Sequence, residues 1–262
     1  MRRFFVICLF VISSALFAEI IEIKHFNEIE KYALDDTLVI LDIDNTLLMP
    51  AQELGSDQWF RYRLDCYRKE GKTYPEALEF ALPEWEAIQN ITDVLVVEET
   101  TPEVIRNLQK LERVRIIGLT TRGLALAMRT VQQLDKVGID LSVSAPTKDE
   151  IPLLNPHAIL FRKGVLFTAG THKGRGLQKL LAKLEYMPKK IVFINDKRGN
   201  LRQLEEGVNE LHIPFIGLRY GFLDEKVNNF RADIADLQFE NFLKIVNDHE
   251  AEMILNYKDC NG

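Results

Sequence analysis

Two carboxylates stand two residues apart at the end of an apolar run in the stretch TLVILDIDNTLL, residues 37–48. In a strand, residues i and i+2 point to the same side, so Asp42 and Asp44 would repel each other unless a cation lies beside them. Mg²⁺ prefers oxygen ligands and usually takes one or two carboxylates together with waters and substrate phosphate. The pair therefore predicts a magnesium site, with a turn that caps the next helix as the alternative.

Two further apolar runs also end in polar residues. VRIIGL leads into Thr120 and the adjacent Thr121, and KKIVFI leads into Asn195 and Asp196. Asp196 would supply a second acidic side chain to the metal, and the Thr120 hydroxyl could bind a phosphate oxygen. The alternatives are a helix N-cap for Thr120, with Thr121 as the second choice of hydroxyl, and a helix-start acid for Asp196.

Lys173 lies between two glycines in GTHKG and could neutralise a phosphate. The alternative is a solvated lysine near the start of a helix. The stretch GTHKGRG resembles a glycine-rich phosphate loop only weakly, because the Walker order of Gly-Lys-Ser/Thr is missing. His172 could contact a leaving group or be an ordinary surface histidine, and Arg122 could touch substrate or lie on the surface.

The elements that must position these residues alternate between strands and helices. The three runs are short and rich in Val and Ile, which favours strands buried on both faces of a parallel sheet. Helical patterns follow at Thr100–Glu112 (with capping-box spacing), in LALAMRTVQQLDKVG up to Gly138, and in GLQKLLAKLEY. This order predicts an α/β protein with a Rossmann-like, three-layer, doubly wound parallel sheet, in which ligands bind beyond the carboxyl ends of the strands.

Residues 49–100 interrupt the alternation. They are rich in aromatic residues, helical in character and too long for a simple crossover. We therefore expect an inserted helical cap at 49–100 and an α/β core at 19–48 and 101–262. The cap aromatics could form its own core or a platform for substrate. A hairpin is expected at 157–169, and a C-terminal helix from about residue 222.

The first 18 residues have the pattern of a secretory signal peptide. Arg2 and Arg3 precede an apolar run from Phe4 to Ile12, and Ala18 offers a cleavage site. Spanning a bilayer takes about 20 apolar residues, so a membrane anchor is disfavoured. We expect a protein exported to the periplasm or beyond, with no stable membrane anchor after cleavage.

Charge and cysteine content narrow the function classes further. Without the signal, the formal net charge changes from −6 to −8, and no basic footprint of a nucleic-acid binder is left. Only Cys66 and Cys260 would remain, as two lone thiols or as a pair in an oxidising compartment. No Cys/His cluster indicates zinc.

Four of these features together resemble the haloacid dehalogenase (HAD) superfamily of phosphohydrolases. Asp42-Ile43-Asp44-Asn45-Thr46 is similar to the family's first motif, DxDxT. Thr120, Lys173 and FINDKRGN are similar to the second, third and fourth motifs, and the order along the chain is the family's. The stretches DIDNTLL and GSDQW are also similar to uncharacterised secreted HAD-like bacterial proteins.

The resemblance implies a role for each matched residue. Asp42 would be the nucleophile that forms an aspartyl-phosphate, and Asp44 the general acid and then base, with a pKa raised by a neighbouring carboxylate and burial. Mg²⁺ would be held by the Asp42 carboxylate, the Asp44 backbone carbonyl and Asp196. The remaining expected site residues are Thr120, Lys173, Asn45 and Thr46 for substrate, and Asn200 and Asn195 behind them, with Asn200 orienting Lys173 or a metal-bound water.

Position 195 departs from the family pattern, because it is Asn where many members carry Asp or Gly. Dehalogenases of this fold lack an acid at the position of Asp44, so its presence favours phosphoryl chemistry. The expected function is an exported Mg²⁺-dependent phosphatase acting on a phosphorylated small molecule. The alternatives are a phosphotransferase or phosphomutase, or a non-catalytic binding or effector protein with the same fold. The sequence does not specify the substrate or the oligomeric state.

Overall fold

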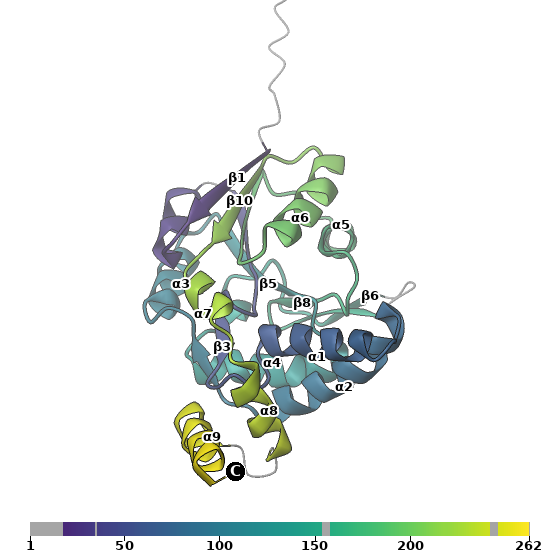
Figure 1. Ribbon diagram of the computed structural model, residues 1–262. Coiled ribbons are helices and arrows are strands. Elements are labelled where there is room, and N and C mark those ends of the chain that lie inside the picture. Colours follow the sequence, from purple (N-terminus) through teal and green to yellow (C-terminus); the bar gives the residue numbers. More distant parts are fainter. Residues whose placement is uncertain (1–17, 35, 154–157, 242–245, 262) are drawn as a thin grey trace, which may run out of the picture.

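An eight-stranded sheet forms the centre of the chain in the computed structural model (Figure 1), which describes residues 18–34, 36–153, 158–241 and 246–261. The first six strands in spatial order are parallel, and the last two are antiparallel additions at one edge. Their order is β1 (Ala18–Ile23), β10 (Phe215–Tyr220), β9 (Lys190–Asn195), β2 (Thr37–Leu41), β5 (Val114–Thr120), β8 (Val165–Phe167), β7 (Ile159–Arg162) and β6 (Ile151–Leu153).

The central strands are apolar at most positions because both of their faces are covered. In β2, Val39 and Leu41 belong to one buried cluster, whereas Leu38 and Ile40 belong to the other. The same alternation continues in β5 and β9, as the two-residue period of a strand requires. The sheet therefore separates two hydrophobic cores, and the predicted three-layer parallel architecture is confirmed.

Each core is closed by amphipathic helices. The first is covered by the 3₁₀ helix η1 (Phe26–Lys31), α3 (Thr101–Gln109) and α4 (Ala127–Lys136). The second is covered by α5 (Lys173–Leu184) and α6 (Arg198–Glu210). Short 3₁₀ turns precede and follow α4 at η2 (Leu124–Leu126) and η3 (Leu141–Val143). The expected C′ glycine of α4, Gly138, has a left-handed φ of 78°.

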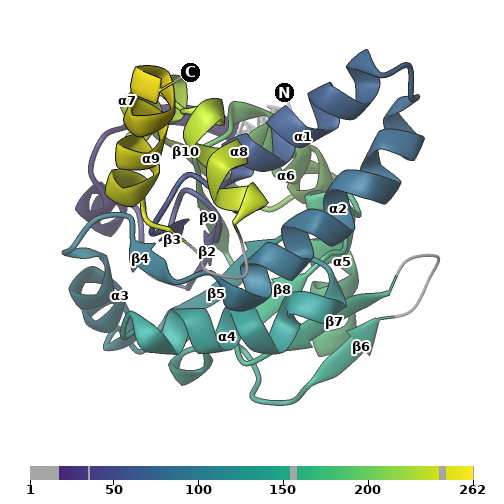
Figure 2. The same ribbon diagram turned by 60° about the horizontal axis from the view of Figure 1, so that its bottom comes forward.

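A helical pair is inserted between two short strands. The chain leaves the core through β3 (Leu48–Pro50) and returns through the antiparallel β4 (Val94–Val96). Between them, α1 (Asp57–Lys69) and α2 (Tyr74–Ile91) lie side by side and extend away from the sheet (Figure 2). Trp59 and Trp85 are buried in the cluster beneath this pair, so these two aromatic side chains pack the cap. The domain boundaries stay a prediction.

Some elements differ from the sequence prediction. The region after residue 222 is not one helix but three: α7 (Asp224–Asn228), α8 (Ala232–Glu240) and α9 (Asp248–Asn261). The predicted hairpin is present as β7 and β8, whereas the edge strands β1 and β6 were not predicted. Thr100 is the N-cap of α3 but makes no side-chain capping bond.

The N-terminal prediction and the cysteine pairing stay open. The signal peptide and its cleavage site fall almost entirely outside the described residues, which begin at Ala18. Cys66 is half-buried on α1, and the side chain of Cys260 lies outside the described part of the chain. Within that part, no helix combines the length and apolar character needed to cross a bilayer.

Candidate active site

The predicted site residues come together at the carboxyl edge of the central strands. Asp42 directly follows β2, Thr120 is the last residue of β5, and Asp196 directly follows β9. Because β2 pairs in parallel with both β5 and β9, the three strand ends meet at one edge of the sheet. The backbone N–H of Asp42 donates to the carbonyl oxygen of Ile194 at 3.1 Å, which ties the end of β2 to that of β9.

Asp42 and Lys173 form a buried ion pair at this edge. The exposed fractions of their side chains are 7% and 1%, and the Lys173 ammonium donates to Oδ1 of Asp42. The same ammonium donates to the Leu119 carbonyl at 3.3 Å and lies 5.5 Å from the centre of the Phe193 ring. Lys173 is therefore not a solvated lysine, and its charge is directed at the predicted nucleophile.

Close helix packing places Lys173 there. Lys173 is the first residue of α5, and α5 crosses α6 with Gly174 against Gly207. A Cβ at Gly207 would lie 2.6 Å from the Gly174 Cα, and a Cβ at Gly174 would lie 2.5 Å from the Gln203 carbonyl oxygen. Gly176 meets Thr168 in a similar way. Gly174 therefore permits the close crossing of α5 and α6, and Gly176 permits close packing against Thr168.

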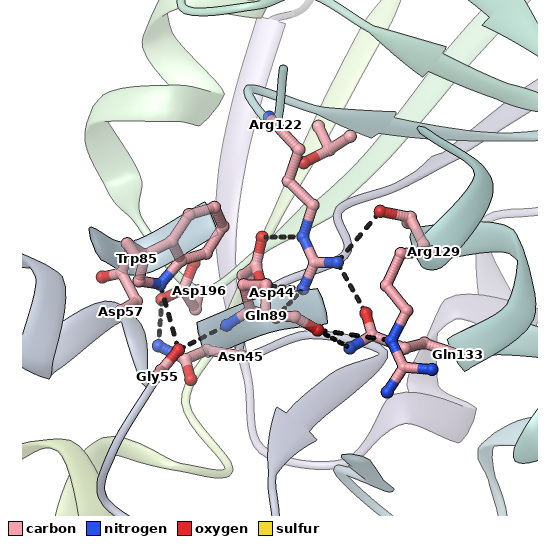
Figure 3. A network of polar contacts seen from close by, with 12 residues as sticks. Asp44, Asn45, Gly55, Asp57, Trp85, Gln89, Arg122, Arg129, Gln133 and Asp196 are labelled. Atoms are coloured by element: carbon pink, nitrogen blue, oxygen red, sulfur yellow. Dashed lines mark hydrogen bonds and ion pairs between the residues drawn. The ribbon is translucent and has the colours of Figure 1, made fainter. Parts of the chain in front are cut away.

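Arg122 makes a bidentate ion pair with Asp44, as Figure 3 shows. Nη2 lies 2.7 Å from Oδ1, and Nε lies 3.1 Å from Oδ2. Arg122 has an exposed fraction of only 3%. The interpretation of Arg122 as a surface residue is therefore wrong, whereas contact with substrate stays a prediction.

The remaining N–H groups of Arg122 bind cap and core helices. Nη1 donates to the Thr130 hydroxyl at 2.9 Å and to Oε1 of Gln133 at 2.7 Å, both on α4. Nη2 also donates to Oε1 of Gln89 on α2 at 3.1 Å. With the two bonds to Asp44, these contacts use the full donor capacity of the guanidinium. Arg122 therefore links the DxDxT turn to the inserted helices.

The Arg122 pair reverses the expected behaviour of Asp44. Burial by itself would raise the pKa of Asp44, but the charge and hydrogen bonds of Arg122 outweigh burial and lower that pKa below its usual value. The predicted raised pKa is therefore wrong, because a cation and not a second carboxylate dominates its surroundings. Burial raises the pKa of Asp42, an effect that Lys173 opposes and Asp44 reinforces.

The signal for Arg122 was present in α4. Thr130 and Gln133 are fully or almost fully buried on the same helix face as Ala127 and Leu134. Polar side chains on a buried helix face need hydrogen-bond partners. Such a pair, 8 and 11 residues after an arginine that lies just beyond a strand, could have identified a buried cation.

Asp196 carries an unsatisfied buried oxygen. Its Oδ2 accepts a long hydrogen bond from Nδ2 of Asn45 at 3.5 Å, while its buried Oδ1 has no partner among the described residues. Burial raises the pKa of Asp196 to about 7, opposed by Lys197 and reinforced by the charges of Asp42 and Asp57. An orphaned carboxylate oxygen of this kind is what a bound cation would satisfy.

The donor set fits a hard divalent cation with few protein ligands. No group of three or more His, Cys, Asp or Glu side chains converges on one point in the described ranges. Mg²⁺ needs only one or two carboxylates and keeps several waters. Asp42 and Asp196, with the Asp44 backbone carbonyl, are the residues that would hold it.

The other predicted residues have mainly structural contacts. The Thr120 hydroxyl accepts from the backbone N–H of Arg122 at 3.1 Å. Thr46 is fully buried, and its hydroxyl has no partner among the described residues. Asn45 has a left-handed φ of 59°, and its backbone N–H donates to the Leu48 carbonyl at 2.9 Å, closing the turn after Asp44.

Asn200 does not orient Lys173 as expected. Its side-chain amide donates to Oδ1 of Asn195 at 3.3 Å, and the same oxygen accepts from the backbone N–H of Lys197 at 2.7 Å. The two asparagines therefore stabilise the loop that carries Asp196. His172, which precedes Lys173, lies 3.5 Å from Glu206 on α6.

A cleft of about 790 Å³ opens beside Asp196, and we call it the α1–α6 cleft. It lies between α1, the start of α6, the end of β10 and α7. Its lining includes Asn45, Asp196 and Asn200 from the site region, Lys197 beside them, and Asp57 and Arg61 from the cap. The cleft is thus the space through which a ligand would reach the Asp196 side of the site.

Comparison with known proteins identifies the family of this chain. The model of a family described as "Protein of unknown function (DUF2608)" matches residues 22–252. The chain belongs to this family. Its DxDxT turn, Lys173 and Asp196 all fall within the matched residues.

The chain is also similar to proteins of Chlamydia and Rickettsia. A "Putative outer membrane protein" of Chlamydia muridarum (strain MoPn / Nigg) is 31% identical over 242 residues, which cover 91% of each chain. One of the same name in Chlamydia trachomatis serovar D is 27% identical, over 95% of this chain and 97% of the relative. An uncharacterized protein of Rickettsia prowazekii (strain Madrid E) is 24% identical, over 85% of this chain and 84% of the relative.

Among solved structures, a HAD-superfamily hydrolase (subfamily IA, variant 1) of Geobacter sulfurreducens is similar to this chain. The TM-score is 0.39 at 12% identity, over 74% of this chain and 96% of that one. A likeness at this level carries no argument about activity.

Proposed function

We propose that this DUF2608 protein is a Mg²⁺-dependent phosphatase of the HAD type, working through an aspartyl-phosphate on Asp42. The observation that carries the proposal is the buried Asp42–Lys173 ion pair beside the unpartnered Oδ1 of Asp196. A buried aspartate, a buried lysine and a second aspartate with one buried oxygen, close together at the carboxyl edge of the sheet, are costly for stability. A cation and a phosphoryl group would compensate all three charges.

Each residue has a distinct task in this proposal. A carboxylate oxygen of Asp42 forms a bond to phosphorus while the bond to the ester oxygen breaks, and that oxygen leaves with the electron pair. Lys173 holds the Asp42 carboxylate in place and neutralises charge on the transferring phosphoryl group. When bound, Mg²⁺ supplies electrostatic stabilisation of the phosphoryl oxygens.

Asp44 suits the second half of this reaction better than the first. Because Arg122 lowers its pKa, Asp44 is ionised at neutral pH and can accept a proton from the water that hydrolyses the aspartyl-phosphate. An ionised carboxylate has no proton to give to the leaving oxygen. We therefore expect substrates whose leaving groups are weak bases, such as aryl or acyl phosphates, to react faster than alkyl esters.

A non-catalytic binding or effector role is the second candidate, and the Arg122 clamp on Asp44 is the observation that favours it.

A phosphotransferase or phosphomutase would use the same intermediate as the phosphatase. An added alcohol or sugar would capture the phosphoryl group from a transferase and leave a hydrolase product unchanged.

An exported, envelope-associated location is part of the proposal. Relatives of 26–31% identity carry the name "Putative outer membrane protein", and the N-terminal sequence predicts a signal peptide. Fractionation of cells that produce the chain with a C-terminal tag would test this location. Retention in the cytoplasm would contradict it.

The direct test of activity is hydrolysis of a generic aryl phosphate with and without Mg²⁺. The wild-type protein should turn over only with the metal, and Asp42→Asn should abolish turnover while circular dichroism stays unchanged. Activity that persists in Asp42→Asn would refute the proposal. Lack of turnover by wild type, combined with no thermal shift on adding Mg²⁺ and fluoroberyllate, would favour the binding or effector role.

A further inference from the structure

The α1–α6 cleft contains a charge arrangement that the proposed reaction does not use. Lys197 follows the metal-side acid Asp196, and its ammonium donates to both carboxylate oxygens of Asp57 at 2.8 and 2.7 Å. Asp57 is the first residue of the cap helix α1. One ion pair therefore spans from the loop of the site to the cap, directly over the cleft.

Asp57 is shared between two cations. Nε of Arg61, one turn along α1, lies 3.1 Å from the Oδ2 atom that Lys197 also contacts. The other two cleft arginines, Arg198 and Arg219, pair with Glu22 and Asp224. The Asp57 cluster is thus the part of the cleft with more positive than negative charge, and it lies next to Asp196.

Lys197 is close to the reacting groups without belonging to the matched motif positions. Its side chain is 30% exposed in this structure, and its charge acts on Asp42, Asp44 and Asp196 alike. A phosphoryl group held at Asp42 would therefore lie within the field of this ammonium. Among the described residues, Asp57 is the one carboxylate that forms an ion pair with this ammonium.

We propose that Lys197 is a phosphate-binding residue of this site and that Asp57 is its internal competitor, which an incoming phosphoryl group displaces. The inference rests on the proposed function, because it takes a phosphoryl group as the ligand. Displacement frees Asp57 and with it the contact that ties α1 to the Asp196 loop. Because the ligand must compete with Asp57, the observed affinity for phosphate is lower than the intrinsic affinity.

The competition predicts opposite effects for two variants that break the same ion pair. Lys197→Gln removes the ammonium and should weaken the binding of inorganic phosphate, measured calorimetrically with Mg²⁺, by about tenfold or more. Asp57→Asn removes the competitor and should tighten phosphate binding by about three- to tenfold. Lys197→Arg keeps the cation and should keep most of the affinity, which guards against a folding defect in Lys197→Gln.

A second lysine–aspartate pair provides the matched control. Lys136 on α4 pairs with Asp93, which follows α2, so this pair also links the end of the cap to the core. Its side chains are exposed and do not line the α1–α6 cleft. Lys136→Gln and Asp93→Asn should leave phosphate affinity unchanged.

The outcomes separate this inference from the proposed function. If Lys197→Gln and Asp57→Asn weakened phosphate binding equally, the inference would be overturned, and the ion pair would have a purely structural role. Unchanged affinity in Lys197→Gln, or no phosphate binding by wild type, would also overturn it. If hydrolysis depends on Asp42 but Lys197→Gln leaves phosphate affinity unchanged, the phosphatase proposal holds and the inference about Lys197 fails. If Lys197→Gln weakens and Asp57→Asn tightens phosphate binding but the protein shows no turnover, the phosphate site is supported and the phosphatase proposal is refuted.

Discussion

Replacing Arg122 by methionine should destabilise the protein strongly. The substitution keeps most of the side-chain volume, removes a buried guanidinium and leaves the partly buried Asp44 carboxylate without its bidentate partner. It also removes the donors to Thr130, Gln133 and Gln89. Removing one partner of a buried ion pair typically costs about 3–5 kcal/mol, so we expect a loss of this size in the free energy of unfolding at pH 7.

The pH is chosen from the pKa of Asp44. Because Arg122 lowers that pKa, the pair contributes its stability above the pKa of the unfolded chain and loses it as the pH falls through the lower, folded pKa. At pH 7 the contribution is complete. In a chain of this size, 1 kcal/mol corresponds to about 2–4 °C in melting temperature, so the expected decrease is roughly 6–20 °C.

Urea unfolding and thermal melts would measure the effect, and Arg231→Met is the control. Arg231 pairs with Asp233, but both side chains are about half exposed, so its loss should cost at most about 1 kcal/mol. The double variant Arg122→Met with Asp44→Asn should be less destabilised than the two single variants combined, since no carboxylate is left unpaired. A cost for Arg122→Met within about 1 kcal/mol of the control would refute the role given to this arginine.

Three further predictions follow from the site. Gly207→Ala should destabilise the protein by about 1–3 kcal/mol and reduce turnover, because the new Cβ meets the α5 backbone beside Lys173. Gly199→Ala on the same helix is the control. Its Cβ meets nothing within 4 Å, so this variant should be neutral or stabilising in urea unfolding. Because the pKa of Asp196 is raised to about 7, the protonated side chain stabilises the metal-free folded protein at low pH. This contribution is lost as the pH rises from about 4 to 7. The Mg²⁺-induced rise in melting temperature should therefore grow from pH 5 to pH 8 and be absent in Asp196→Asn; a shift that is equal at both pH values would contradict this. Finally, turnover of aryl phosphates should increase steeply as the leaving phenol becomes more acidic, and a flat dependence would show that Asp44 or another acid protonates the leaving oxygen.

The central fold was predictable because its signals are local. The strands β2, β5 and β9 are apolar on both faces, and each ends at a polar residue that marks the carboxyl edge. Any parallel arrangement of such strands brings Asp42, Thr120 and Asp196 to one edge. Lys173 was identified from its place between two glycines and its similarity to the third motif, and the structure places it at the start of α5 beside that edge.

The rest depended on contacts that no local pattern specifies. The edge strand β1 exists because it pairs with β10, nearly 200 residues later in the chain. The pKa of Asp44 is determined by Arg122, 78 residues away, and by helices that hold this arginine in turn. The C-terminal region was predicted as one helix, whereas α8 and α9 pack against each other in one buried cluster, a contact that no local pattern specifies.

The most direct test of the central claim is the mass of the protein after reaction with a phosphoryl donor. We predict that acid-quenched Asp44→Asn, mixed with Mg²⁺ and an aryl phosphate, accumulates one phosphoryl group, which peptide mapping locates on Asp42. Accumulation is expected because, in the proposed reaction, Asp44 would be the base that activates water for breakdown of the intermediate. Hydrolysis by the wild type without any such adduct in Asp44→Asn, or an adduct on a residue other than Asp42, would contradict the account.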